Sequence, residues 1–100
     1  MKKIFVTRKL LKENEEKLKE LFEVKLNSQD KIYSPEEIIN ESKDCDGILT
    51  SVTDFINRDT ISKLSNSIKI IANGAVGYGN IDCKAAKEKG ITVTNTPDVL

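Results

Sequence analysis

Short apolar runs alternate along the chain with longer segments in which apolar and charged residues recur at helical spacing. Five runs predict β-strands, over residues 3–7, 23–27, 46–52, 68–72 and 91–95. Four segments predict amphipathic helices, over residues 10–22, 34–42, 57–66 and 81–90. This regular alternation favours an α/β fold, a parallel sheet with helices on both faces. An α+β sandwich is the alternative.

Local signals mark where two of these helices begin and end. Ser34 and Glu37 have the spacing of a capping box, which predicts a helix start at this point. Asp82 or Asn80 is expected to cap the helix over 81–90. Gly90 stands where a left-handed residue would end that helix.

Length and charge limit the classes of function. One hundred residues form one domain at most. Lys plus Arg and Asp plus Glu number 16 each, so no basic excess points to nucleic acid or to an anionic membrane. No apolar run approaches the ~20 residues that cross a bilayer. The start, MKKIFVTRKLL, lacks the long apolar stretch of a signal peptide, so we read it as the first strand and expect a cytoplasmic protein.

The sequence offers few groups for catalysis or metal binding. It contains no histidine, which excludes Ser-His-Asp and Cys-His catalysis and histidine metal sites within this chain. Cys45 and Cys83 fit no metal or redox spacing, and we expect both to be reduced and structural. We therefore predict no metal site.

A glycine-rich stretch, NGAVGYGNID (73–82), follows the most apolar strand. Its G-x-x-G-x-G spacing is the reverse of a dinucleotide fingerprint, and no Gly-Lys-Ser/Thr of a phosphate-binding loop follows. Two interpretations remain open from the residues alone. The glycines permit a tight strand-to-helix turn, or the backbone amides near Gly74 and Gly77 converge into a nest that binds a small carboxylate or phosphate. In the second case the start of the following helix would add partial positive charge.

The last third of the chain resembles the D-isomer-specific 2-hydroxyacid dehydrogenases, especially the glyoxylate/hydroxypyruvate reductase and phosphoglycerate dehydrogenase branch. The family pattern VGYDNID, an Ala-rich helix and GI-VTNTPGVL corresponds here to residues 76–82 and 90–100. The stretch CDGILTSVTDFI (45–56) is similar to the family's third strand and loop. Two residues depart from the pattern, Gly79 in place of Asp and Asp98 in place of Gly.

The resemblance implies a flavodoxin-like, five-stranded parallel sheet of strand order 2-1-3-4-5. Residues 1–100 would be the N-terminal portion of the substrate-binding domain, without the Rossmann cofactor domain and the C-terminal segment. In the family, main-chain amides matching Ala75, Val76 and Gly77 hold the substrate carboxylate. The loop matching Val52 and Thr53 borders the same pocket.

The resemblance also implies where the chemistry lies. The complete enzyme would use NAD(P)H to reduce a small 2-keto acid such as glyoxylate or hydroxypyruvate, and its dimers would form mainly through the missing domain. The family's histidine, glutamate and arginine lie beyond the equivalent of position 100, and neither Arg8 nor Arg58 matches that arginine. We therefore expect no catalytic residue in this chain, no cofactor bound by it, and no activity by these residues alone.

Two functions of other classes compete with this reading. The chain could be a free-standing module of flavodoxin-like fold that binds small carboxylates or another protein. A receiver-like signalling domain is the second alternative. It would need an acidic cluster at the first strand, where the sequence reads VTRK, and a phosphoacceptor at the end of the third, where Asp54 stands too far into the loop.

Overall fold

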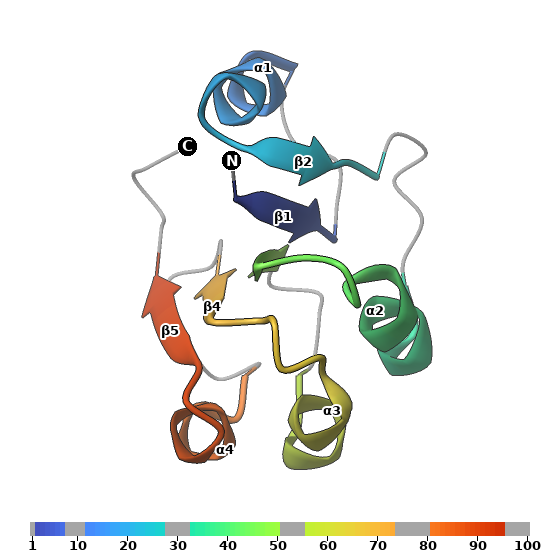
Figure 1. Cartoon of the computed structure of the whole chain (residues 1–100), viewed down its shortest axis with the longest axis vertical. Helices are drawn as coiled ribbons and strands as arrows, with labels where there is room; N and C mark the ends of the chain where they lie inside the picture. The colour runs from blue at the N-terminus through green and yellow to red at the C-terminus, as the bar shows by residue number, and fades with distance from the viewer. Residues whose placement is uncertain (1, 8–11, 28–32, 51–55, 74–80, 96–100) are drawn as a thin grey trace.

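Five parallel strands form one sheet in this computed structural model, which describes residues 2–7, 12–27, 33–50, 56–73 and 81–95. The strands are β1 (Lys3–Val6), β2 (Glu23–Lys25), β3 (Gly47–Thr50), β4 (Ile70–Asn73) and β5 (Thr92–Asn95). Their order is β2-β1-β3-β4-β5, and every neighbouring pair is parallel (Figure 1). The predicted fold class and strand order are confirmed.

Four helices connect the strands, as the alternating pattern predicts. They are α1 (Lys12–Leu21), α2 (Pro35–Glu41), α3 (Arg58–Lys63) and α4 (Cys83–Glu88). Helices α2, α3 and α4 are shorter than the amphipathic segments that predicted them, because residues at both ends of each segment act as caps. Asp82 caps α4 through its carboxylate, and Gly90 follows α4 with a φ of 82°, a left-handed conformation that glycine adopts at no steric cost.

The capping box of α2 is present as predicted. The Glu37 amide donates to the Ser34 side chain at 3.2 Å, and the Ser34 amide donates to the Glu37 carboxylate at 3.0 Å. Pro35 occupies the first helical position, where its missing N–H costs no helical hydrogen bond. This helix start is therefore specified by residues adjacent in sequence.

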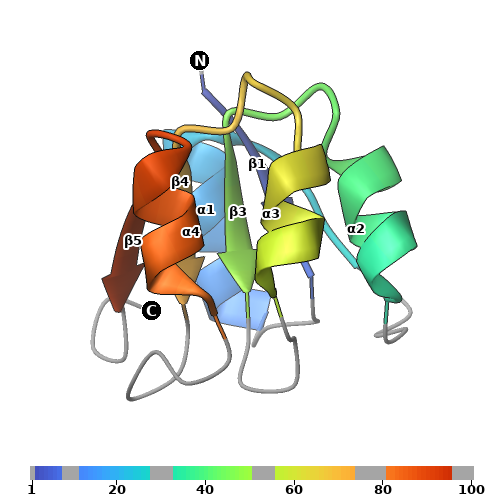
Figure 2. The same cartoon turned by 90° about the horizontal axis from the view of Figure 1, so that it is seen from below.

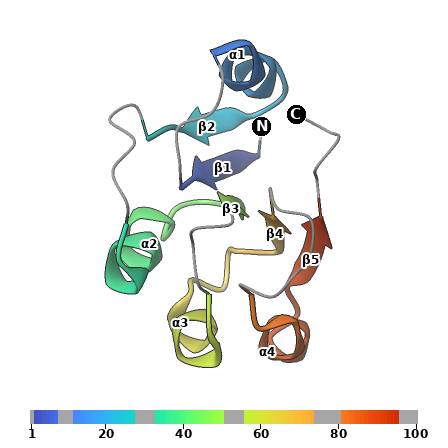
Figure 3. The same cartoon turned by 180° about the vertical axis from the view of Figure 1, so that it is seen from behind.

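Helices cover both faces of the sheet, but unequally. Helices α2, α3 and α4 lie together on one face, and α1 lies on the other beside β1 and β2 (Figures 2 and 3). The larger core fills the three-helix face and includes Phe5, Ile48 and Ile71, each with at most 1% of its surface exposed. A smaller core beneath α1 is built from buried Val6, Leu18 and Leu49 with half-buried neighbours. Alternate residues of each strand therefore enter different cores, as the pleat of a strand requires.

Lys89 links the end of α3 to α4. Its ammonium donates to three main-chain carbonyls at the end of α3, those of Ile61 and Ser62 at 3.0 Å and that of Leu64 at 2.6 Å. The last carbonyls of a helix have no partner within the helix, so this side chain satisfies them.

We expect Lys89→Met to lower the free energy of unfolding by about 1–2 kcal/mol, because it keeps the aliphatic stem and removes the donors. Chemical denaturation monitored by circular dichroism measures the change. Lys87→Met on α4 is the matched control and should change stability little. Equal effects of the two substitutions would show that the three hydrogen bonds of Lys89 contribute nothing to the free energy of unfolding.

Cys45 is fully buried, and its thiol hydrogen faces the Asp44 carboxylate, with Sγ at 3.7 Å from Oδ1. Burial first, and then this neighbouring negative charge, raise the pKa of Cys45 from 9.0 to about 11. The folded state therefore keeps the proton to higher pH than the unfolded chain does.

This difference predicts alkaline destabilisation. Because the unfolded thiol ionises first, the stability associated with Cys45 is intact below pH 9 and falls by roughly 2 kcal/mol as the pH rises to about 11. Denaturant titrations at several pH values, compared with those of Cys45→Ala, isolate this contribution from that of the lysines. Parallel stability profiles for the two proteins would contradict the prediction.

Candidate functional site

The carboxyl ends of the five parallel strands meet at one edge of the sheet, toward which the arrowheads of β3, β4 and β5 point in Figure 2. In parallel sheets this edge is where ligands bind. Thr50, Asn73 and Asn95 are paired across it as the last residues of β3, β4 and β5. Thr7 directly follows β1, and Asn27 follows β2. The side-chain amide of Asn27 donates to the main-chain carbonyl of Thr7 at 2.9 Å. These strand-end residues are all uncharged and polar, so none of them repels an anion.

The predicted substrate-binding residues lie outside the described residues. Val52 and Thr53 fall within 51–55, and Ala75, Val76 and Gly77 fall within 74–80. Whether their amides converge on a carboxylate therefore stays a prediction. The structure does describe the residues that flank both segments.

The flanking residues are paired at both ends. Thr50 and Asn73, which precede the two segments, are register partners in β3 and β4. Ile56 and Ile81, which follow them, form a parallel bridge, and the Asp82 amide donates to the Ile56 carbonyl at 2.9 Å. Both isoleucines are buried. The two segments that carry the predicted binding residues therefore start side by side and end side by side.

The N-terminus of α4 is already compensated. Oδ1 of Asp82 accepts a hydrogen bond from the Ala85 amide at 3.0 Å, so a carboxylate occupies the positive end of this six-residue helix. The partial positive charge expected there is offset by this carboxylate.

Arg58 opens α3, as the sequence indicated, and it is engaged by another helix. Its Nη1 lies 2.7 Å from Oε2 of Glu88 at the end of α4. This hydrogen bond and the accompanying charge attraction raise the pKa of the Arg58 guanidinium. Both side chains are more than half exposed, so the pair is screened by water and joins α3 to α4 only weakly.

The described residues contain no group of three His, Cys, Asp or Glu side chains that could hold a metal ion. Cys45 and Cys83 are both free, as expected, with Cys45 buried and Cys83 half-buried. No helix in the described ranges has the length and apolar character needed to span a bilayer.

Sequence reasoning missed two features of this edge. It did not find the Ile56–Ile81 bridge, because a single pair of isoleucines leaves no periodic signal. It also overlooked that four of the five strands end in, or are followed directly by, Thr or Asn: Thr7, Thr50, Asn73 and Asn95. That repeated ending was readable in the sequence.

Comparison with known proteins shows a match along nearly the whole chain. Residues 4–100 match the model of the D-isomer specific 2-hydroxyacid dehydrogenase catalytic domain. A protein named glyoxylate reductase from Korarchaeum cryptofilum is 40% identical over 98 residues, which cover 98% of this chain and 29% of that protein. This chain therefore spans less than a third of the length of that relative.

Solved structures agree. A crystal structure described as a D-isomer specific 2-hydroxyacid dehydrogenase, NAD-binding, from Polaromonas sp. JS6 66 superposes with a TM-score of 0.92 and 33% identity, over 100% of this chain and 31% of that one. The NAD+-bound 3-phosphoglycerate dehydrogenase of Entamoeba histolytica gives a TM-score of 0.79 and 28% identity, over 95% and 32% of the two chains. Family match, sequence relatives and fold lead to one conclusion: this chain belongs to the D-isomer specific 2-hydroxyacid dehydrogenase family, within its catalytic domain.

Proposed function

We propose that this chain is the N-terminal portion of the substrate-binding domain of an NAD(P)-dependent D-2-hydroxyacid dehydrogenase. The complete enzyme would reduce glyoxylate- or hydroxypyruvate-like 2-keto acids. The observation that carries the proposal is the family match over residues 4–100 together with 40% identity to a protein named glyoxylate reductase. That relative extends well beyond the part this chain covers, which is consistent with a two-domain enzyme.

The role we assign to this chain is to bind and orient the substrate. Main-chain amides of Ala75, Val76 and Gly77 would hold the substrate carboxylate, and Val52 and Thr53 would border it. The pairing of the flanking residues supports this assignment, because the described residues before and after the two segments lie next to each other.

Proton and hydride transfer would belong to other parts of the enzyme. The chain has no histidine to protonate the reacting oxygen, and general acid catalysis needs such a group within hydrogen-bond reach. The start of α4, the described helix that follows the glycine-rich stretch, offers no open position for a dinucleotide phosphate. A pyrophosphate binds at an open helix N-terminus, and that of α4 is occupied by the Asp82 carboxylate. The NAD(P)H that the proposal requires would therefore be held outside this chain.

The free cysteines support a reducing compartment for the enzyme. Disulfides are rare in the cytoplasm, and neither Cys45 nor Cys83 is paired. We therefore include a cytoplasmic location, and a possible homodimer of the complete enzyme, in the proposal.

The deciding experiment joins this chain to the cofactor domain and C-terminal segment, taken from its own gene or from the Korarchaeum relative. NAD(P)H oxidation is then followed at 340 nm with glyoxylate and with hydroxypyruvate. We expect turnover of at least one of them, none by the 100 residues alone, and a raised KM in Gly77→Val, whose added side chain would obstruct the carboxylate. Absence of turnover with every 2-keto acid tested would refute the enzyme proposal.

The same experiment separates the alternative function. Titration of the isolated chain with glyoxylate or oxalate, followed by NMR chemical shifts, detects binding without catalysis. Saturable binding by a chain that gives no active enzyme would favour a free-standing carboxylate-binding module. Turnover by the joined enzyme would favour the dehydrogenase.

A further inference from the structure

The carboxyl edge of the sheet carries a row of uncharged polar residues, one from the end of each strand. Thr50 pairs with Asn73, and Asn73 pairs with Asn95. The register of β1 with its two neighbours extends this row, because it places Thr7 opposite Thr50 and Asn27 opposite Thr7. The five strands therefore end in Thr or Asn at one level of the sheet.

Three side chains of this row are buried, those of Thr7, Asn27 and Thr50, each at most 3% exposed. The described residues include five buried polar side chains, so this row holds three of the five. Thr7 and Thr50 stand two residues after Phe5 and Ile48, on the side of the sheet that carries the larger core. Packing alone would favour valine at both positions, because valine fills nearly the same volume and has no hydroxyl to satisfy. The buried hydroxyls therefore point to a role beyond packing.

Each of these three side chains donates to a main-chain carbonyl on the next strand. The Asn27 amide donates to the Thr7 carbonyl at 2.9 Å. The Thr7 hydroxyl donates to the Leu49 carbonyl of β3 at 3.4 Å, and the Thr7 main-chain amide donates to the same carbonyl at 3.1 Å. The Thr50 hydroxyl in turn donates to the Ala72 carbonyl of β4 at 3.4 Å. The two hydroxyl contacts are long for O–H donors, so each is weak alone and the series acts as a set.

This series ends on the two strands that lead to the proposed substrate loops. Thr50 is the last residue of β3 and directly precedes residues 51–55. Ala72 is followed by Asn73, which ends β4 and directly precedes residues 74–80. The contact of the Thr50 hydroxyl with the Ala72 carbonyl thus joins the points at which both segments begin. A shift of either strand end would displace the start of the segment that follows it, because the two are continuous in the chain.

We propose that Thr50, supported by Thr7 and Asn27, is a positioning residue for substrate binding. The inference rests on the proposed function, because it gives these residues the task of aligning the two segments to which that function assigns the substrate. They act through main-chain carbonyls rather than through contact with the substrate. They therefore affect the affinity for the keto acid and leave hydride transfer, which belongs to other parts of the enzyme, unchanged.

Substitutions of Thr50 in the joined enzyme described above test the proposal. Thr50→Val keeps the shape of the side chain and removes the hydroxyl, whereas Thr50→Ser keeps the hydroxyl. We expect Thr50→Val to raise KM for the keto acid about fivefold, with kcat and the KM for NADH or NADPH changed less than about twofold. Thr50→Ser should keep KM within about twofold of the parent value. A KM that valine leaves unchanged, or that serine raises as much as valine does, would overturn the proposal.

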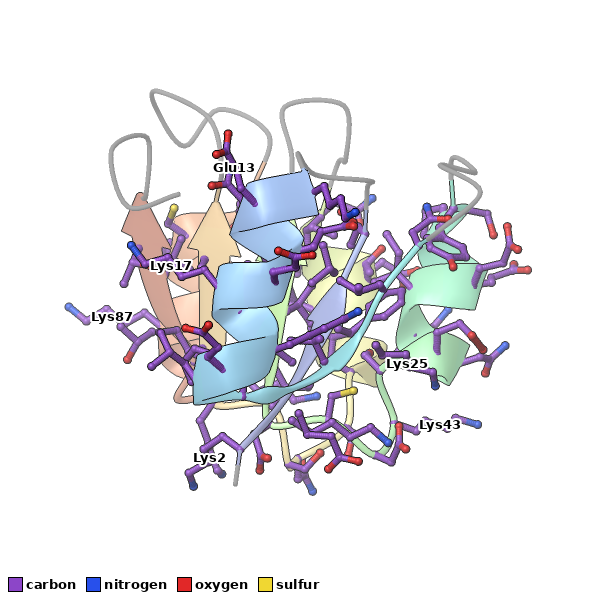
Figure 4. All side chains as sticks on the ribbon, turned by 90° about the horizontal axis from the view of Figure 1, so that it is seen from above. Lys2, Glu13, Lys17, Lys25, Lys43 and Lys87 are labelled. Atoms are coloured by element: carbon purple, nitrogen blue, oxygen red, sulfur yellow. The ribbon has the colours of Figure 1, made fainter. Side chains whose placement is uncertain are left out.

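Ser42→Ala is the control that separates positioning from loss of stability. Ser42 is also fully buried, and its hydroxyl donates to the Ile38 carbonyl at 2.7 Å. It lies far from the carboxyl edge, because the next residue, Lys43, lies at the end of the molecule opposite the strand arrowheads in Figure 4. We expect Ser42→Ala to lower the melting temperature at least as much as Thr50→Val and to leave KM unchanged. An equal rise of KM in both variants would show that KM follows stability, against the proposal.

A double variant tests whether Asn27 acts through the same series. Asn27→Leu removes the amide donor and should raise KM in the parent enzyme. It should raise KM little further in Thr50→Val, since the effects of residues in one hydrogen-bond network do not add. Thr7→Val makes the same comparison if Asn27→Leu does not fold. Effects on KM that multiply independently would exclude a connected series.

Binding of oxalate distinguishes a failure of this inference from a failure of the proposed function. Its dissociation constant, measured by titration calorimetry on the joined protein, does not depend on turnover. Weaker oxalate binding by Thr50→Val, without turnover by any variant, would support the positioning role and refute the proposed activity. Turnover with the same KM in Thr50→Val and the parent would refute the positioning role alone. Neither turnover nor oxalate binding would refute both.

Discussion

Replacing Ile71 by alanine is expected to destabilise the chain by about 3–4 kcal/mol, a large part of the stability of a domain of this size. Ile71 is fully buried in β4, in the larger core between the sheet and helices α2, α3 and α4. Removing three carbon atoms there loses their burial and leaves a cavity, because the surrounding strands and helices relax only partly.

Urea denaturation monitored by circular dichroism measures this loss. Ile71→Val, which removes a single methylene, should cost about 1 kcal/mol. Lys69→Ala, two residues earlier in the chain and exposed, should be nearly neutral in the 100-residue chain. The prediction also concerns the site, since β4 carries Asn73 and leads into residues 74–80. A cost for Ile71→Ala no larger than that of the valine variant would contradict this account of the core.

Gly47→Val is expected to cost about 3 kcal/mol, for the opposite reason, because the position has no space for a side chain. A Cβ at Gly47 would lie 2.7 Å from Cγ2 of Ile70, 3.1 Å from Cδ1 of Ile4 and 3.2 Å from the Ile70 carbonyl oxygen. The methyl group of Ile70 could move only with its own rotamer, and the carbonyl oxygen is main chain. Strands β3 and β4 would therefore have to separate.

This strain would act on the loops of the candidate site. Gly47 and Ile70 are register partners, and three residues further along the same two strands Thr50 pairs with Asn73. We expect Gly47→Val to lower the melting temperature and, in the joined enzyme, to raise KM for the keto acid.

Gly90→Asn is the matched control. Gly90 has φ of 82° and no atom within 4 Å of a built Cβ, and asparagine tolerates that conformation, so the cost should stay small. If Gly47→Val lowers the stability no more than Gly90→Asn does, β3 and β4 can separate without strain, which would contradict the prediction.

The sequence alone was enough for the order and type of the elements. Strand and helix periodicity are local properties, and the capping box of α2 involves residues only three apart, so both were predicted correctly. Family membership was also predictable, because it rests on a dense linear match. The strand order followed from that resemblance rather than from the periodicity.

Only the tertiary structure decided which distant residues meet. The Ile56–Ile81 bridge, the three carbonyls bound by Lys89 and the close approach of Gly47 to Ile70 each join residues more than 20 positions apart. No local pattern encodes these contacts, because they depend on how whole strands and helices pack.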